Sequence, residues 1–138
     1  MKVQVIRSNR KTIGLEVRAD ESVILRAPAV DEISDVEWKS ILGEFTERVN
    51  YFCKIMEVTV GRITIRNQKT RWGSCSSKGN VNFNYQLYYM PRELMDYVII
   101  HELSHRRHMN HSAEFWQEVE KYCKTYRECR KKLRDYEI

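Results

Sequence analysis

The residues best able to do chemistry lie together near the C-terminal end of the chain. All four histidines of the 138 residues fall between His101 and His111, and His101-Glu102-x-x-His105 forms the pattern H-E-x-x-H. On a helix, residues four apart lie about 40° from each other around the axis and about 6 Å apart along it, so both imidazoles can reach one ion. In this pattern the histidines hold zinc, and the glutamate takes a proton from the zinc-bound water. The sequence therefore predicts a hydrolytic metal centre with Glu102 as its acid/base.

A zinc site of this kind needs a third protein ligand. His108 would share the helical face of His101, but it lies about 10 Å along the axis from it, too far to share one ion. Asn110 tolerates the left-handed conformation that ends helices, so we expect the chain to turn near His111 and bring that side chain back. His111 is the favoured third ligand, at a metzincin-like spacing, although His108 stands where that pattern has glycine. Two glutamates, Glu118 and Glu128, are alternatives, as in thermolysin-type sites.

The helices that must carry these ligands are predicted from hydrophobic periodicity. Residues 94–100 are apolar around most of a helix, which indicates that the metal-binding helix is buried and begins near Pro91. Ser112 is a good cap for a final helix, whose apolar stripe runs from Phe115 to Leu133. Buried histidines in such a position need polar partners, and a metal provides one.

The N-terminal part is predicted to supply strands and one packing helix. Residues 3–6, 13–18 and 23–27 alternate apolar with polar side chains and predict an antiparallel meander that ends at Pro28. Apolar residues at helical spacing predict a helix over residues 33–56, with its start near Ser34.

A second group of strands is expected between that helix and the metal-binding helix. Strands are predicted at residues 58–60 and 62–66, and the turn signal at 76–80 joins residues 72–75 to 81–87 as a hairpin. In the second arm of the hairpin, alternation predicts one buried face and one polar face that looks onto the cleft. We expect the substrate to pair with this arm, Val81 to Leu87, as an edge strand.

Other polar residues of the sequence are of types that can take part in catalysis. Residues 71–75 include Cys75, which has no base of its own because the histidines serve the metal, so we interpret this segment as a hairpin arm that braces the helix. Candidate oxyanion stabilisers are Arg71, Tyr85 and Tyr97, which the sequence does not rank. None of the four cysteines forms a C-x-x-C pair, which favours reduced thiols used in packing.

The bulk composition is that of one globular domain, expected to span residues 1–138. The chain is 42% hydrophobic and 31% charged, and it shows neither a signal peptide nor an apolar run long enough to cross a bilayer. We therefore expect a cytoplasmic protein with no membrane partner. The net charge of +5 permits a weak association with nucleic acid, although a solvated basic surface explains the charge equally well.

Several motifs together resemble the YgjP-like metallopeptidase family, relatives of the SprT-like proteases. The residues that carry this resemblance, which covers most of the chain, are Thr70–Cys75, Gly79–Asn84, Pro91, Tyr97–His105, Asn110–Ser112 and Phe115–Trp116. The resemblance implies a compact zincin-like α+β fold and a peptide or protein substrate. It also implies Zn²⁺ held by His101, His105 and His111, with Glu102 as catalytic acid/base. Arg106 departs from the family, which more often has an apolar residue there.

These features are compatible with functions from two different classes. The first is a zinc-dependent metallopeptidase. The second is a DNA-associated or protein-binding module in which zinc is structural. An open coordination position would favour the enzyme, and a fourth protein ligand would favour the structural site.

Overall fold

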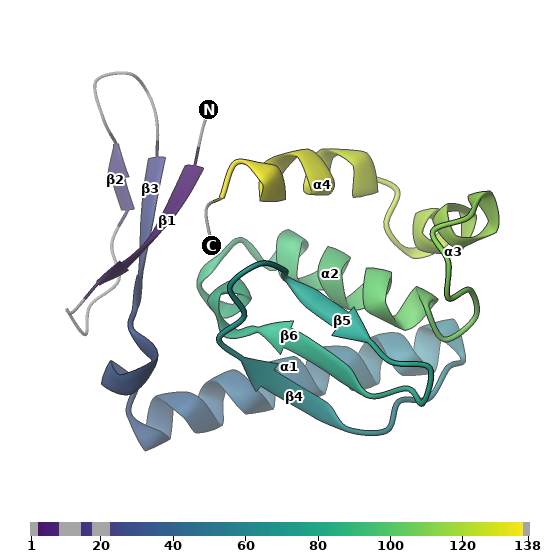
Figure 1. Cartoon of the computed structure of the whole chain (residues 1–138), viewed down its shortest axis with the longest axis horizontal. Coiled ribbons are helices and arrows are strands. Elements are labelled where there is room, and N and C mark those ends of the chain that lie inside the picture. The colour runs from purple at the N-terminus through teal and green to yellow at the C-terminus, as the bar shows by residue number, and fades with distance from the viewer. Residues whose placement is uncertain (1–2, 9–14, 18–22, 137–138) are drawn as a thin grey trace.

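A buried helix, α2 (Arg92–Ser104), lies at the centre of the fold (Figure 1). The structure is a computed structural model, and it describes residues 3–8, 15–17 and 23–136. Helix α2 contacts α1 (Asp35–Met56), α3 (Ala113–Tyr122) and α4 (Tyr126–Arg134), together with strands of the second sheet. Nine of its thirteen residues are buried, which confirms the burial predicted from its apolar circumference. The mixed α+β fold class is likewise confirmed.

Helix α1 packs along α2 as its apolar spacing predicts. Ser34 caps its start by accepting a hydrogen bond from the Glu37 backbone N–H (3.1 Å), and Glu57 ends it in the left-handed conformation. One face is buried and consists of Ile41, Phe45, Val49, Phe52 and Met56. The Phe45 ring stacks on Phe83 with centroids 5.6 Å apart, which joins α1 to the second sheet.

The N-terminal strands form a sheet, but not the predicted meander. The order is β1-β3-β2, where β3 (Val23–Pro28) pairs in parallel with β1 (Val3–Ser8) and antiparallel with β2 (Leu15–Val17). Alternation predicts which residues share a face, but it does not specify which strand is the neighbour. The turns expected between these strands lie largely outside the described residues.

The second sheet contains the predicted hairpin and one parallel neighbour. Its order is β4-β6-β5, where β6 (Val81–Asn84) pairs antiparallel with β5 (Gly73–Cys75) and in parallel with β4 (Ile63–Arg66). The turn is closed by the hydrogen bond from Ser76 N to Asn80 O (3.0 Å) and uses Gly79 at φ 87°. The strand predicted at residues 58–60 is irregular instead. Because β6 is central, the expectation that a substrate pairs with it as an edge strand is wrong, and β5 is the edge nearest α2.

Two of the three polar residues predicted to face the cleft from the second arm of the hairpin are buried, and Asn82 alone is half-buried. Strand β6 ends at Asn84, and a short 3-10 helix, η2 (Tyr85–Tyr89), follows. Asn84 and Gln86 are both fully buried. The Asn84 side chain accepts from Gln86 N (3.0 Å) and donates to Gln68 O (2.9 Å), so it caps η2 rather than facing the cleft. The predicted exposure of Asn84 was wrong because its side chain satisfies backbone groups. The Gln86 side chain is buried with no hydrogen-bond partner among the described residues, and nothing in the structure explains its burial.

The predicted final helix is two helices. Helix α3 ends at Tyr122, Cys123 has an extended conformation (φ −140°, ψ 90°), and α4 begins at Tyr126. The buried residues Phe115, Val119, Tyr126, Cys129 and Leu133 keep helical spacing across the break. Periodicity therefore did not reveal the interruption, which lets α4 lie along α2 (Figure 1).

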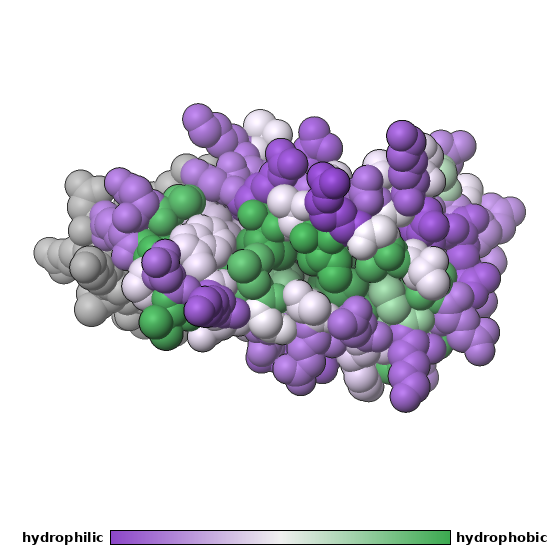
Figure 2. Space-filling view, turned by 90° about the horizontal axis from the view of Figure 1, so that it is seen from below, coloured by the Kyte–Doolittle hydropathy of each residue, from purple (hydrophilic) through white to green (hydrophobic). Residues whose placement is uncertain are grey.

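The surface includes a broad apolar area. On the face seen from below in Figure 1, apolar residues gather in a band bordered by hydrophilic ones (Figure 2). The large apolar side chains most exposed on α1 are Val36, Leu42, Tyr51 and Ile55. Among the helices of the described residues, none has the length and apolarity that a membrane span requires.

Candidate metal centre

Three histidines converge at the C-terminal end of α2. His101 lies in the helix, His105 at its cap, and His111 in the loop before α3. One ring nitrogen from each lies within 4.8 Å of the others, and the Nε2 atoms of His101 and His111 are 3.2 Å apart. Nitrogens bound at about 2.0–2.1 Å to a tetrahedral ion lie about 3.3 Å from one another, a separation that the His101–His111 pair already has. Three imidazole donors also suit the chemistry of a zinc-like ion. No other histidine, cysteine, aspartate or glutamate of the described residues joins this group.

The chain reverses direction just after the second histidine. Helix α2 ends at Ser104, and backbone hydrogen bonds from Arg107 N (3.1 Å) and His108 N (3.0 Å) to Ser104 O close the turn. The sequence predicts that the chain turns at Asn110 and His111, but the reversal begins earlier, directly after Ser104. Ser112 then caps α3 by accepting from Phe115 N (3.3 Å). His111, the residue before that cap, is held against the other two rings.

The other ring nitrogens of the α2 histidines also have partners. His101 Nδ1 lies 3.1 Å from the Tyr97 hydroxyl, and His105 Nδ1 lies 3.1 Å from the backbone oxygen of His108. Metal-binding histidines commonly donate their second N–H to such oxygens, which fixes the ring and the tautomer. Both contacts leave Nε2 available for an ion. His108 thus contributes its carbonyl and not its ring.

Aromatic residues of α3 pack against the three imidazoles. Phe115 is fully buried, and its ring centroid lies 5.0, 4.5 and 4.9 Å from those of His101, His105 and His111. Burial, followed by repulsion from the other two rings, lowers the pKa of His101 to about 3. Burial likewise lowers the pKa of His105. The α2 imidazoles are therefore neutral at pH 7, as metal ligation requires.

Glu102 is buried between α2 and strand β5. Only 6% of its surface is exposed, and burial raises its pKa to about 8, with Arg71 opposing the shift. A Cβ atom placed on Gly73 would lie 3.1 Å from both Cγ and Oε2 of Glu102. The backbone of β5 thus forms one wall of the carboxylate's site, and a side chain at position 73 would press on Glu102.

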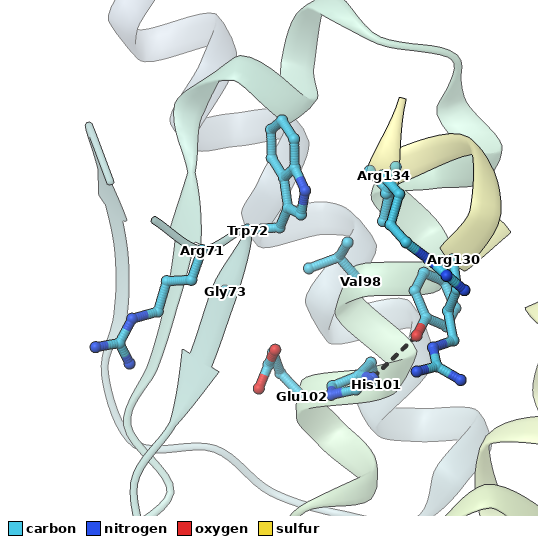
Figure 3. Close-up of a pocket in the computed structure, with 10 residues that line it drawn as sticks. Arg71, Trp72, Gly73, Val98, His101, Glu102, Arg130 and Arg134 are labelled. Atoms are coloured by element: carbon cyan, nitrogen blue, oxygen red, sulfur yellow. Dashed lines mark hydrogen bonds between the residues drawn. The ribbon is translucent and has the colours of Figure 1, made fainter. Parts of the chain in front are cut away.

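Two adjoining cavities open on this group. One, of about 300 Å³, includes all three histidines, and the other, of about 380 Å³, lies between β5, α2 and α4. Both are lined by Arg71, Gly73, His101 and Glu102. Figure 3 shows the larger one, with Glu102 and His101 between β5 and α4. Together they form a cleft in which a peptide could reach both the histidines and the carboxylate.

Three candidate residues predicted from the sequence lie away from the histidine group. Glu118 is 5% exposed and forms ion pairs with Arg107 (3.5 Å) and Lys121 (3.2 Å), and Glu128 is exposed on α4. Neither alternative third ligand is near the ring nitrogens. The Tyr85 hydroxyl is buried and donates to Pro28 O (2.9 Å), so Tyr85 cannot stabilise an oxyanion in the cleft.

The hairpin and Arg106 have packing roles. Cys75 lines the cleft, but burial raises the pKa of its thiol, which keeps it protonated. Arg106 donates to Thr59 O (2.8 Å), and its guanidinium covers Gly79, where a Cβ would lie 2.6 Å from Cζ. The unusual arginine therefore connects the hairpin turn, where it also donates to Ser77 O (3.4 Å), to the segment that follows α2.

Sequence reasoning missed some residues of the site. The contact of Gly73 with Glu102 and the packing of Phe115 below the imidazoles depend on tertiary structure, and no local pattern marks them. Tyr97 was considered only as an oxyanion stabiliser. Its position four residues before His101 on the same helix was the available signal.

Comparison with known proteins identifies the class to which this fold belongs. The solved metallopeptidase zymogens abylysin of Pyrococcus abyssi and jannalysin of Methanocaldococcus jannaschii are each 25% identical to the chain. Their TM-scores are 0.59 and 0.57, over 64% of this chain and 90% and 92% of theirs. Wss1 of Saccharomyces cerevisiae, at 12% identity, shares the fold with a TM-score of 0.55 over 94% of this chain and 92% of its own. No curated protein sequence matches significantly.

The fold and these neighbours define a zincin-like metallopeptidase class of protein. Residues 29–136 match the YgjP-like metallopeptidase domain, and the chain belongs to that family. It is accordingly a hydrolase of the metallopeptidase type, and the resemblance predicted from the sequence is confirmed.

Proposed function

We propose that this protein is a zinc-dependent metallopeptidase whose metal ligands are His101, His105 and His111. The observation that carries the proposal is the convergence of three imidazoles beside one buried carboxylate in an open cleft. Three neutral ligands would leave the full double charge of the ion available to activate a water molecule and polarise a carbonyl group. We propose further that residues 1–138 act as one domain.

Glu102 is the proposed acid/base of the reaction. Its carboxylate would accept a proton from the attacking water and donate it to the leaving amine of the cleaved peptide bond. Burial raises its pKa to about 8 in the protein without metal, and a cation beside it would lower that value. Gly73 allows the carboxylate to lie against β5, and Tyr97 orients His101 through Nδ1.

The substrate is proposed to pair with β5. This strand is the edge of its sheet next to α2, and its residues Gly73, Ser74 and Cys75 all line the cavity that contains the histidines. An extended peptide can add to such an edge through backbone hydrogen bonds. Of the candidate oxyanion stabilisers, Tyr97 is engaged with His101. Arg71 lines both cavities, but its guanidinium points away from Glu102 and would have to turn toward the cleft to take this role.

A structural zinc site in a DNA-associated or other protein-binding module is the alternative. It would require a fourth protein ligand, and within the described ranges the group contains three histidines alone. A DNA role would also predict salt-sensitive binding of the basic protein to duplex DNA. The three histidines line a cavity, so a fourth coordination position would be accessible to water or substrate. This accessibility favours the metallopeptidase over a structural zinc site.

Metal removal and restoration test this proposal. Chelation should abolish hydrolysis of an unstructured protein substrate, and one equivalent of Zn²⁺ should restore it. His101→Ala should bind far less zinc and should not be rescued at that concentration. Unchanged hydrolysis in the chelated protein would refute a metal-dependent mechanism.

A further inference from the structure

Two arginines of α4 lie beside His101 in the larger cavity. Arg130 and Arg134 are four residues apart, so they share one face of the helix. Both line the cavity of about 380 Å³ together with His101 and Glu102. In Figure 3 the two side chains lie close together on the α4 side, whereas Arg71 points away on the far side of Glu102.

These two guanidinium groups lack an acidic partner. Neither has a carboxylate oxygen within 4.0 Å in the part of the chain that the structure describes. Three other arginines there do form ion pairs, namely Arg48, Arg92 and Arg107. Among the described residues, Glu102 is the one acid that lines the cavity, against the two arginines of α4, because the Arg71 side chain points away from it. An anion that entered this cavity would therefore meet uncompensated positive charge.

The position of Arg130 is stabilised by an aromatic ring. Its guanidinium carbon lies 4.4 Å from the centroid of the Trp116 ring. Stacking on an aromatic face leaves the N–H groups at the edge of a guanidinium free to donate to a carboxylate. Trp116 also packs against His101, at a centroid distance of 5.6 Å, so the arginine and the metal ligand are held by the same side chain.

The remaining walls of the cavity are apolar. Trp72, Val98 and Leu133 line it between β5, α2 and α4. Apolar walls with positive charge at one side suit a short aliphatic stem that ends in a carboxylate. A nucleic-acid duplex is far too large to enter a space of this volume, so the cavity favours a peptide group over DNA.

We propose that Arg130 and Arg134 form a subsite that binds a carboxylate of the peptide substrate beside the scissile bond. The inference rests on the proposed peptidase function and adds a substrate class to it. The carboxylate belongs either to an acidic side chain or to the C-terminus of the substrate, and either can accept paired hydrogen bonds from a guanidinium group.

Peptide binding tests the subsite without turnover. The zinc-loaded Glu102→Gln protein is titrated by calorimetry with acetylated, amidated alanine hexapeptides that carry one Glu, Gln or Lys at each position in turn. At one position the Glu peptide should bind about five- to tenfold more tightly than the Gln peptide, as for a partly exposed pair with arginine. A Gln peptide with a free C-terminus distinguishes the terminal carboxylate as the source.

Matched variants assign the preference to these arginines. Arg130→Gln/Arg134→Gln should abolish it, whereas Lys124→Gln/Lys131→Gln, which removes two exposed charges that line neither cavity, should retain it. Arg134→Glu should shift the preference toward the Lys peptide. Equal binding of all peptides, or a preference that survives loss of both arginines, would overturn the subsite.

Failure of the proposed peptidase function and failure of the carboxylate subsite would be seen in different measurements. If the zinc-loaded wild-type protein cleaved no peptide, the proposed function would fail, while the binding preference of the Glu102→Gln protein would still test the subsite. If the protein bound a short DNA duplex only when Arg130 and Arg134 were present, and bound all the peptides equally, this face would instead be assigned to nucleic acid.

Discussion

Replacing Gly73 by alanine should impair catalysis while leaving the metal in place. The added methyl group would lie 3.1 Å from Cγ and Oε2 of Glu102 and 3.1 Å from the backbone oxygen of Asn82. Carbon atoms pack best at about 3.5–4.0 Å, so the methyl is roughly half an ångström too close. Asn82 belongs to the paired strand β6, so the Glu102 side chain is the neighbour that must move.

A displaced acid/base is costly because catalysis depends on its position. A misplacement of about 1 Å can cost about 100-fold in rate, so a shift of half that size should lower kcat about tenfold. Overpacking should also reduce the free energy of unfolding by about 1–3 kcal/mol.

The assay compares kcat, zinc content and urea denaturation for Gly73→Ala and a matched control, Gly43→Ala. Nothing lies within 4 Å of a Cβ placed on Gly43 in α1, so the control should keep full activity and gain slightly in stability. Zinc content should be unchanged in both. Wild-type kcat in Gly73→Ala would refute the idea that β5 positions Glu102.

Three further predictions concern the histidines and the buried carboxylate. Tyr97→Phe removes the hydroxyl that lies 3.1 Å from His101 Nδ1 and should weaken zinc affinity about 10–100-fold. Competition with a chromophoric chelator measures this affinity. An unchanged affinity would contradict a role of Tyr97 in orienting the His101 ring. His111→Ala should lose far more zinc than His108→Ala, because His108 contributes its backbone oxygen, and equal losses would argue against His111 as the ligand. In the metal-free protein, burial raises the pKa of Glu102 from 4.5 to about 8, so the folded state holds a proton that the unfolded state releases. The free energy of unfolding of wild type should therefore fall relative to that of Glu102→Gln as the pH rises from about 4.5 to 8, by up to about 3 kcal/mol at pH 7. Urea denaturation at several pH values measures this difference. A difference that did not vary with pH would contradict the burial of this charge.

Local sequence patterns were sufficient to predict the helices and the hairpin that carry the candidate metal site. The apolar circumference of residues 94–100 predicted the burial of α2, and Ser34 and Ser112 marked the starts of α1 and α3. The hairpin at residues 76–80 followed from its turn residues, because Gly79 adopts the positive φ that such turns require. These features depend on near neighbours in the chain.

The errors concern features that local patterns do not encode. Strand β3 lies between β1 and β2, although its own alternation would suit either neighbour. The break between α3 and α4 preserves the spacing of the apolar stripe, so periodicity continued through it. Asn84 is buried because it caps η2, and β6 is a central strand because β4 joins it in parallel. Each of these features depends on a contact with a residue distant in the sequence or on a hydrogen bond to a backbone group.

The candidate site was predictable where chemistry coincides with spacing along one helix. His101, Glu102 and His105 were candidates from the pattern, and His111 was favoured over Glu118 and Glu128 because the chain was expected to turn there; the structure places its ring beside the other two. The contribution of β5 was not predictable, since the close approach of Gly73 to Glu102 requires the packing of the hairpin on α2. The same holds for Arg130, which reaches His101 only because α4 lies along α2.

The central claim is that Glu102 works beside a metal ion held by three histidines. The most direct measurement is single-turnover cleavage of one defined peptide by wild-type and Glu102→Gln protein at equal, measured zinc content. We predict that the variant binds one zinc per chain and retains less than about 1% of the wild-type rate, because it cannot accept the proton of the attacking water. Cleavage by Glu102→Gln at the wild-type rate would contradict the mechanism.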